Sequence, residues 1–340
     1  GMKPIIIHHR SVHHASNSGY SRLIDYLSEV NLISGNVKFP HKLAKFISKN
    51  TNQNASDYDS LSVLKEIELF KHLLKSEQQL VHYLNAERDI RHIVNYKNRF
   101  KNVSFCGTFH KPPLILQNQI KDNSYLKKLD GAIAVGENQV EFLKNWLKNE
   151  NVTYIPHGVD TNFFVPNKSK KKNNTIMFVG QHLRDFKLFN TCIPIIAEKI
   201  SDLKINVVIR KEYVKQIESH SAINIFSGIN DFELRSLYQE SSLLFLPLKD
   251  VTACNSILEA LACGLPIVTT DVGGNSSYLN GTKNILAPPD KDFTISAIIN
   301  LLNNENKLIQ IGESSREHSL NFDWSLIVKQ IELFYKSLVV

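Results

Sequence analysis

The chain has 340 residues, of which 42% are hydrophobic and 21% charged. This composition is typical of proteins that bury a core and excludes disordered and fibrous chains. The length predicts two domains. No stretch approaches the roughly 20 apolar residues that cross a bilayer, and no signal-like leader opens the sequence. Four cysteines lie mostly in apolar runs without C-x-x-C spacing, so we expect a cytoplasmic protein with reduced thiols.

The net charge of +7 is concentrated in one half of the chain. Residues 1–165 hold 21 lysines and arginines against 15 acids, whereas residues 166–340 hold 19 against 18. A basic first half is compatible with a phosphorylated substrate or with peripheral contact at an anionic membrane face. Because the basic residues do not form a dense cluster with interleaved aromatics, no nucleic-acid partner is predicted.

Short apolar runs alternate with helical patterns along the chain, which predicts parallel sheets built from β-α units. In the first half, helices are expected over Tyr20–Val30 and Leu61–Leu74, with a polar loop from Lys49 to Ser60 before the second. The strands expected in this half are Pro4–His8, Leu80–Leu84, Val103–Gly107, Gly131–Val135 and Thr153–Pro156.

A polar, lysine-rich stretch from Pro166 to Asn174 marks the predicted domain boundary. The strands expected after it are Ile176–Val179, Ile205–Ile209, Ile223–Phe226, Leu243–Leu246, Ile267–Thr270 and Ile285–Leu286. We therefore predict an α/β protein with two Rossmann-like domains, residues 1–165 and 166–322, that face each other across a cleft. The last segment, residues 323–340, is predicted to be a helix that crosses back to the first domain.

A short helix between residues 255 and 264 is the most informative element. It follows a strand and a polar loop, and a glycine and a proline end it. The N–H groups at its start belong to Asn255, Ser256 and Ile257, and together with the helix dipole they suit a diphosphate. Glu259 lies one turn further on and could accept hydrogen bonds from a pair of ribose hydroxyls.

The run from Glu259 to Gly274, EALACGLPIVTTDVGG, closely resembles the C-terminal signature of the group 1 glycosyltransferases, also called family GT4, which have the GT-B fold. Other segments fit the same family in the right order: Tyr154–Asp160, Met177–Gly180 and Ser227–Ile229. The resemblance implies transfer of a sugar from a nucleotide sugar to a glycan, lipid-linked or small-molecule acceptor. It also implies retention of the anomeric configuration, with no metal and no other cofactor.

The same resemblance assigns donor-binding residues in the second domain. It gives Glu259 to the nucleotide ribose and the amides at the start of its helix to the diphosphate, with Asp250 and Thr252 of the preceding loop also on the donor side. The family usually has a glutamate eight residues before Glu259, where this chain has Val251. Asp250 is the neighbouring carboxylate that could replace it.

After Gly180 the family commonly has an arginine and then a lysine, which offset the charge of the leaving diphosphate. Here Gln181 stands at the arginine position. Arg184 and Lys187 lie one helical turn apart and are expected to supply the cations, because a site without a metal must stabilise the leaving group with side chains and helix ends.

In the first domain, His110 follows a strand, and the resemblance places it beside the donor sugar and the acceptor, where it would orient rather than abstract a proton. Gly19 fits the family's glycine that lets the backbone approach the donor phosphate or the acceptor. Two histidine pairs lie between residues 8 and 14, but no cysteine or carboxylate stands at ligand spacing, so no metal site is predicted.

Several other classes of enzyme are excluded. The chain lacks the G-x-G-x-x-G run of dinucleotide-binding enzymes and the G-x-x-x-x-G-K-[ST] run of P-loop proteins. The family signature and the lack of a pyridoxal-type lysine context argue against an epimerase or a phosphorylase. The remaining alternative is a non-catalytic GT-B homologue that binds a nucleotide or glycan as a partner subunit, which Val251 keeps open.

Overall fold

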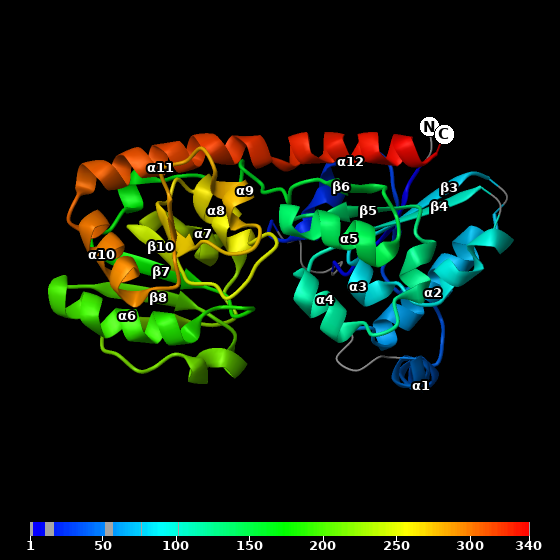
Figure 1. Ribbon diagram of the computed structural model, residues 1–340, viewed down its shortest axis with the longest axis horizontal. Helices are drawn as coiled ribbons and strands as arrows, with labels where there is room; N and C mark the ends of the chain where they lie inside the picture. The colour runs from blue at the N-terminus through cyan, green and yellow to red at the C-terminus, as the bar shows by residue number, and fades with distance from the viewer. Residues whose placement is uncertain (1–2, 11–16, 52–56, 76, 101, 340) are drawn as a thin grey trace. The chain divides into compact units, whose positions relative to one another are not determined.

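The structure is a computed structural model that describes residues 3–10, 17–51, 57–75, 77–100 and 102–339. The chain forms two compact units, which we treat separately (Figure 1). Unit 1 comprises residues 1–15, 20–156 and 327–340, and unit 2 comprises residues 16–19 and 157–326. The boundary after residue 165 stays a prediction. Within the described ranges, no helix is both long and apolar enough to cross a membrane.

Unit 1 contains a parallel sheet of six strands in the order β2-β1-β3-β4-β5-β6. Parallel sheets are covered on both faces, so their strands form continuous apolar runs, and all five residues of β3 are buried. The strands are β1 Ile5–Ile7, β2 Asn31–Ile33, β3 Gln79–Tyr83, β4 Val103–Phe109, β5 Gly131–Ala134 and β6 Val152–Tyr154.

The helices of unit 1 differ from the expectation near the start of the chain. A 3₁₀ helix ends at Tyr26 in place of the predicted helix to Val30, and β2 follows, because three residues are too short a strand to show a period. The helix α1 was not predicted, and it extends to Thr51 in the expected loop. The helices are η1 Tyr20–Tyr26, α1 His41–Thr51, α2 Ser60–Leu73, α3 Ala86–Asp89, η2 Ile93–Arg99, α4 Pro113–Gln119, η3 Ser124–Lys128, η4 Glu137–Gln139 and α5 Val140–Leu147.

Unit 2 contains a second parallel sheet of six strands, in the order β12-β11-β10-β7-β8-β9. Its core joins all four residues of β10 to the apolar faces of the helices around it, with α6 on one side of the sheet and α8 and α11 on the other (Figure 1). The strands are β7 Thr175–Val179, β8 Lys204–Val208, β9 Ile223–Phe226, β10 Leu243–Leu246, β11 Ile267–Thr270 and β12 Ile285–Ala287.

Side-chain caps start several helices of unit 2. Asp185 accepts the N–H of Leu188 at the start of α6, and Asn230 and Glu233 form a reciprocal capping box at the start of α7. The helices are η5 Lys168–Lys170, α6 Phe186–Lys199, η6 Lys211–Gln216, α7 Asp231–Glu240, α8 Asn255–Ala262, α9 Asn275–Leu279, α10 Lys291–Leu302, α11 Glu305–Ser319, η7 Leu320–Phe322 and α12 Trp324–Leu338.

The last helix, α12, begins in unit 2 and belongs to unit 1 from Ile327 onward. In unit 2 its first residue, Trp324, packs against Gly158, where a Cβ atom would lie 2.4 Å from the indole ring. A glycine is therefore needed at position 158 for the tryptophan to pack there. In unit 1, the hydroxyl oxygen of Tyr335 lies 2.5 Å from Nδ1 of the fully buried His82.

Candidate functional site

The carboxyl edge of the sheet in unit 2 is built by loops that hold one another through backbone hydrogen bonds. The N–H of Lys249 donates to the carbonyl of Leu183 at 2.8 Å, and the N–H of Asp185 donates to the carbonyl of Pro247 at 2.9 Å. The loops that follow β7 and β10 are thus tied together. Parallel strands place their carboxyl ends at one edge, which is where ligands bind in open α/β sheets.

Helix α8 begins at this edge without a side-chain cap. Its N-cap residue Cys254 makes no side-chain hydrogen bond, and none of the N–H groups of residues 255–257 has a hydrogen-bond partner among the described residues. Asn255 is the first residue of the helix and is half-buried, and the next two residues, Ser256 and Ile257, are buried. These three N–H groups point along the axis from the positive end of the helix dipole, so the site suits an anion.

Glu259, one turn into α8, is buried, with 2% of its surface exposed. Its two carboxylate oxygens accept hydrogen bonds from the Ser18 hydroxyl at 2.5 Å and the Tyr238 hydroxyl at 2.9 Å. Within the described part of unit 2, no lysine or arginine forms an ion pair with it. The carboxylate is thus held by hydroxyl groups, the type of group that a ribose presents.

Burial raises the pKa of Glu259 to about 7, while the hydrogen bonds from Ser18 and Tyr238 oppose this shift and the nearby Asp231 adds to it. A carboxyl group without a cation nearby loses hydration on burial and has no charge to offset the loss. Ionisation of Glu259 is therefore less favourable than that of an exposed glutamate, and hydroxyl donors stabilise the ionised form.

The partners of Glu259 come from a segment far away in the sequence. Ser18 lies 241 positions before Glu259 and also accepts a hydrogen bond from the Asn255 side chain at 2.8 Å. The neighbouring Asn17 donates its N–H to Asp231 at 2.7 Å. Sequence reasoning did not identify Ser18 or Tyr238 as partners of Glu259. The adjacent Gly19 has a φ of +89° and open space where a Cβ would lie.

In the loop before α8, Asp250 is less buried than the two residues that follow it. Val251 is buried in the apolar core of unit 2, and Thr252 is buried beside it. Asp250 is half-buried, and its Oδ1 accepts the N–H of Val251 at 2.8 Å. The loop packs closely on the one after β11, because a Cβ on Gly273 would lie 2.1 Å from the carbonyl oxygen of Val251.

Arg184 and Lys187 have different surroundings. The Arg184 guanidinium turns back onto its own loop and donates to the carbonyls of Val179 at 2.8 Å and His182 at 2.9 Å. Lys187 is exposed in the first turn of α6. Since Arg184 precedes the N-cap of this helix, the two cations do not share a helical turn, and the expected spacing is wrong on this point.

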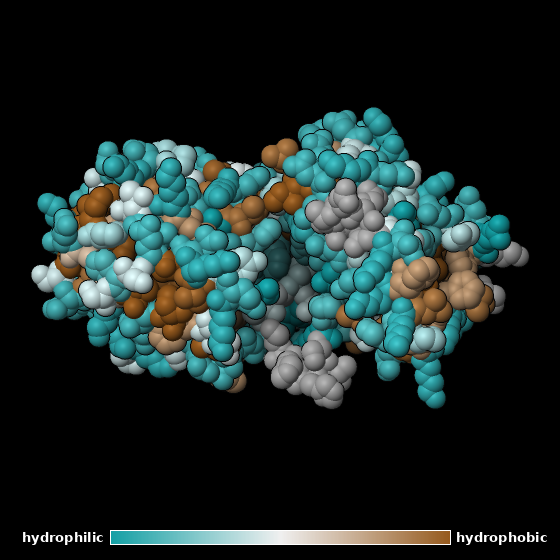
Figure 2. Space-filling model, turned by 90° about the horizontal axis from the view of Figure 1, so that it is seen from below, coloured by the Kyte–Doolittle hydropathy of each residue, from teal (hydrophilic) through white to brown (hydrophobic). Residues whose placement is uncertain are grey.

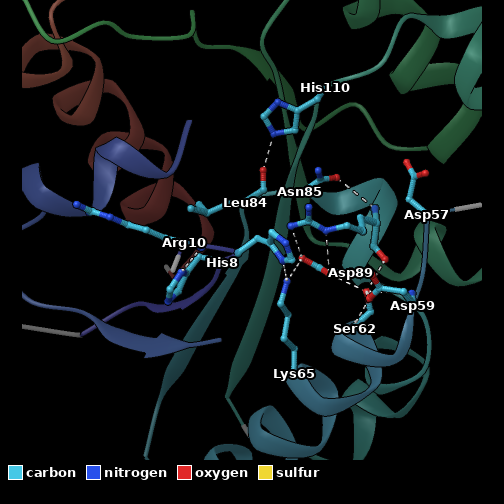
Figure 3. A network of polar contacts seen from close by, with 12 residues as sticks. His8, Arg10, Asp57, Asp59, Ser62, Lys65, Leu84, Asn85, Asp89 and His110 are labelled. Carbon is cyan, nitrogen blue, oxygen red and sulfur yellow. Dashed lines mark hydrogen bonds and ion pairs between the residues drawn. The ribbon is translucent and has the colours of Figure 1, made fainter. Parts of the chain in front are cut away.

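In unit 1, His110 follows β4 at the carboxyl edge of the other sheet. Its Nε2 lies 2.5 Å from the carbonyl oxygen of Leu84, so this nitrogen carries the proton and donates (Figure 3). The backbone N–H groups of His110 and Lys111 both donate to Oε2 of the buried Glu87 carboxylate, each at 2.9 Å. The imidazole is therefore fixed in orientation by the loops around it.

In the same unit, a buried ion pair joins α2 to α3. Nζ of Lys65 lies 3.0 Å from the Asp89 carboxylate, and both side chains are at most 1% exposed. The Ser62 hydroxyl donates to the same carboxylate at 2.9 Å, and Figure 3 shows the three side chains pointing toward one another. Desolvation lowers the pKa of Lys65, while the attraction of Asp89 opposes that change.

Of the two histidine pairs near the start of the chain, only His8 and His9 are described, and residues 13 and 14 lie outside the described residues. Burial lowers the pKa of His8 to about 4, and the pKa of His9 is also lowered by burial. Among the described side chains, no group of three or more histidines, cysteines or acids is placed to hold a metal ion.

Comparison with known proteins finds a family model that matches part of the chain. Residues 173–304 match the family model described as glycosyl transferases group 1. A segment of 239 residues is 26% identical to an uncharacterized glycosyltransferase of Methanocaldococcus jannaschii and covers 66% of each chain. A second alignment, over 256 residues, is with a D-inositol 3-phosphate glycosyltransferase of Corynebacterium urealyticum at 23% identity. It covers 66% of this chain and 59% of that protein. The matched segments thus span 59% and 66% of these two relatives, less than two thirds of either.

Among solved structures, Anabaena Alr3699/HepE in complex with UDP and glucose superposes with a TM-score of 0.70 at 13% identity. The match covers 99% of this chain and 100% of that chain. At this identity the likeness concerns the fold. Two parallel sheets of six strands, as in GT-B glycosyltransferase structures, confirm the predicted α/β class.

Proposed function

Because residues 173–304 match the group 1 glycosyl transferases, as the signature predicted, we propose that the chain transfers a sugar from a nucleotide-sugar donor to an acceptor. The observation that carries the proposal is the pairing at the edge of unit 2. There the N–H groups at the start of α8, which have no partner among the described residues, stand one turn from the Glu259 carboxylate, which accepts hydrogen bonds from two hydroxyls. A diphosphate and a ribose diol need those two kinds of group in that order along a donor.

The donor nucleotide would bind through residues of unit 2. Its diphosphate would accept from the N–H groups of residues 255–257, and a ribose hydroxyl would take the position of the Ser18 hydroxyl on Glu259. Asp250 and Thr252 would lie on the side of the donor sugar, with Asp250 taking the role of the carboxylate that Val251 lacks. The UDP in the Anabaena structure supports a nucleotide donor.

In the transfer step, the bond between the anomeric carbon and the diphosphate oxygen breaks, and a bond to the acceptor oxygen forms on the same face of the sugar. The acceptor proton passes to the departing phosphate, so retention needs no other base. Lys187 would stabilise the charge that develops on the diphosphate. Arg184 would hold the shape of the loop, since two backbone carbonyls already bind it.

The acceptor would be a glycan, a lipid-linked sugar or a small molecule bound on the side of unit 1. Gly19 would let the backbone approach the bound substrates, and His110 would orient the acceptor through its fixed imidazole. The four cysteines are buried and form no disulfide, which supports a location in the reducing cytoplasm. The basic first half further supports peripheral contact with a membrane that carries the acceptor.

Calorimetric titration with UDP, GDP and ADP tests the donor site. One nucleotide should bind, and Glu259→Gln should weaken it by about tenfold to a hundredfold, because a hydrogen bond to an ionised group is lost. Ser18→Ala is the matched control, and it should bind as well as the parent or better because the competing hydroxyl is gone. Equal binding by Glu259→Gln would remove this residue from the site.

Turnover over a panel of sugar nucleotides tests the reaction itself. Lys187→Ala should lower kcat by about a hundredfold with little change in nucleotide affinity, as expected for a group that acts on the leaving charge. Activity should persist in EDTA, and the product should keep the donor's anomeric configuration by NMR. Loss in EDTA or an inverted product would contradict those parts of the proposal.

A second candidate function is a non-catalytic subunit that binds the nucleotide. It is favoured by one observation, the burial of Val251 in the core at the position where the family has a carboxylate. Nucleotide binding without turnover of any donor in the panel would support this candidate over the enzyme.

A further inference from the structure

Helix α1 lies in the most one-sidedly charged part of the chain. From Val30 to Ser56 the sequence contains no aspartate or glutamate, yet it contains four lysines, three of them within α1. These three are Lys42, Lys45 and Lys49. All are exposed, and none forms an ion pair among the described residues.

The sides of α1 have different roles, as its helical period shows. Ala44 is fully buried against α2 and belongs to a small apolar cluster with Tyr58 and Val63. At about 100° per residue, Phe46 points almost directly away from Ala44, and the three lysines form a stripe next to it. Leu43 lies one turn before Phe46 on the same side.

The outward side of α1 is apolar as well as basic. Phe46 is 63% exposed and Leu43 is 45% exposed. Phe46 makes no ring contact with any described residue, in contrast to the equally exposed Phe232 of unit 2, over which Arg235 lies at 5.4 Å. Figure 2, which views the molecule from the side on which α1 lies in Figure 1, shows apolar side chains among hydrophilic ones on this part of unit 1.

Two acids of unit 1, Glu68 on the adjacent helix α2 and Asp57 just before it, contact groups other than these lysines. Glu68 accepts the N–H groups of Gly35 and Asn36, at 3.0 and 3.1 Å. Asp57 is paired with Lys111. The positive charge of α1 is therefore available to an external anionic surface.

We propose that the outward side of α1 docks unit 1 on an anionic membrane, with Phe46 and Leu43 entering the headgroup region and Lys42, Lys45 and Lys49 contacting lipid phosphates. Lysines beside exposed aromatic and aliphatic residues are the pattern of helices that lie in a membrane interface. The inference rests on the proposed function in one respect: it names the surface that would bring the protein to a lipid-linked acceptor.

Co-sedimentation of the full chain with vesicles tests this surface. Vesicles of phosphatidylcholine with phosphatidylglycerol should bind the protein, and vesicles of phosphatidylcholine alone should bind it far less. Phe46→Ser should lower the partition coefficient by about tenfold, since one buried aromatic side chain is lost. The triple variant Lys42→Gln, Lys45→Gln, Lys49→Gln should lower it by about a hundredfold at low salt.

Two matched controls separate α1 from general charge and exposure. Phe232→Ser removes an equally exposed phenylalanine from unit 2, and it should change binding by less than about twofold if α1 inserts alone. The triple variant Lys121→Gln, Lys127→Gln, Lys128→Gln removes the same charge elsewhere in unit 1. An equal loss in this control triple, or binding that ignores the anionic lipid, would overturn the proposal.

The outcome is distinguishable from failure of the proposed function. Vesicle binding is measured without donor or acceptor, so an inactive protein can still dock. Transfer to a water-soluble acceptor should be unchanged in Phe46→Ser, because that side chain is exposed and outside the donor site. Capture of a protein partner by α1 with no binding to vesicles would also contradict membrane docking.

Discussion

The carboxyl edges of the two sheets each bury an acidic side chain, but they stabilise it in opposite ways. In unit 1 Asp89 is paired with the buried Lys65 ammonium at 3.0 Å. In unit 2 the Glu259 carboxyl contacts two neutral hydroxyls, and burial raises its pKa to about 7. An acid already paired with a cation is a structural element. An acid held by hydroxyls can exchange one of them for a ligand's hydroxyl, which is why we place the donor at unit 2.

The largest effect is expected from breaking the ion pair of unit 1. Asp89→Ala leaves Lys65 buried without its counter-charge and should lower the free energy of unfolding by about 3–5 kcal/mol. The double variant Lys65→Met, Asp89→Leu should recover most of this loss, because neither member of the pair is left as an unpaired buried charge. Urea unfolding followed by Trp146 fluorescence in a Trp324→Phe background reports on unit 1. A loss below about 1 kcal/mol in the single variant would show that the pair is not a structural element.

The acid of unit 2 should instead reveal itself in the pH dependence of stability. Its folded pKa of about 7 lies above the ordinary value of 4.5, so the folded state holds more protons between these values. The free energy of unfolding should therefore fall as pH rises through this window, by about 3 kcal/mol in total. Glu259→Gln removes this slope. Parallel curves for the parent and the variant, followed by Trp324 in a Trp146→Phe background, would contradict the raised pKa.

An intermediate effect on stability is expected from the contact between Gly273 and the loop before α8. Gly273→Ala places a Cβ 2.1 Å from the Val251 carbonyl oxygen at a φ of +51°, and we expect a loss above about 2 kcal/mol in unfolding free energy. Gly281→Ala is the control, since its φ is +86° but no atom lies within 4 Å of the added group. It should lose only about 1 kcal/mol. Similar losses at both positions would mean that the loops are not tightly packed.

The smallest effects should distinguish the two cations of unit 2. Arg184→Ala removes hydrogen bonds to two backbone carbonyls and should lower the free energy of unfolding by about 1–2 kcal/mol. Lys187→Ala removes an exposed side chain and should change it by less than about 0.5 kcal/mol. The reverse order in thermal unfolding would assign the structural role to Lys187.

The sequence by itself determined the repeating β-α pattern and the signature from Glu259 to Gly274. Buried parallel strands are continuous apolar runs, and helices repeat every 3.6 residues, so both are visible in a short window of sequence. The α/β class, the main strands of the two six-stranded sheets and the resemblance to the group 1 glycosyl transferases followed from these local patterns. Even so, the three-residue strand β2 left no visible period and was missed.

Only the tertiary structure decided what surrounds the predicted site residues. Glu259 meets a hydroxyl 241 residues away, Arg184 turns back onto Val179, and the lysine that faces Asp89 lies on another helix. Such contacts depend on how loops close at the edges of the sheets, and a loop carries no periodicity from which its path can be read. The sequence therefore named the residue types at each edge, while the packing of the loops fixed their partners, their burial and the pKa of Glu259.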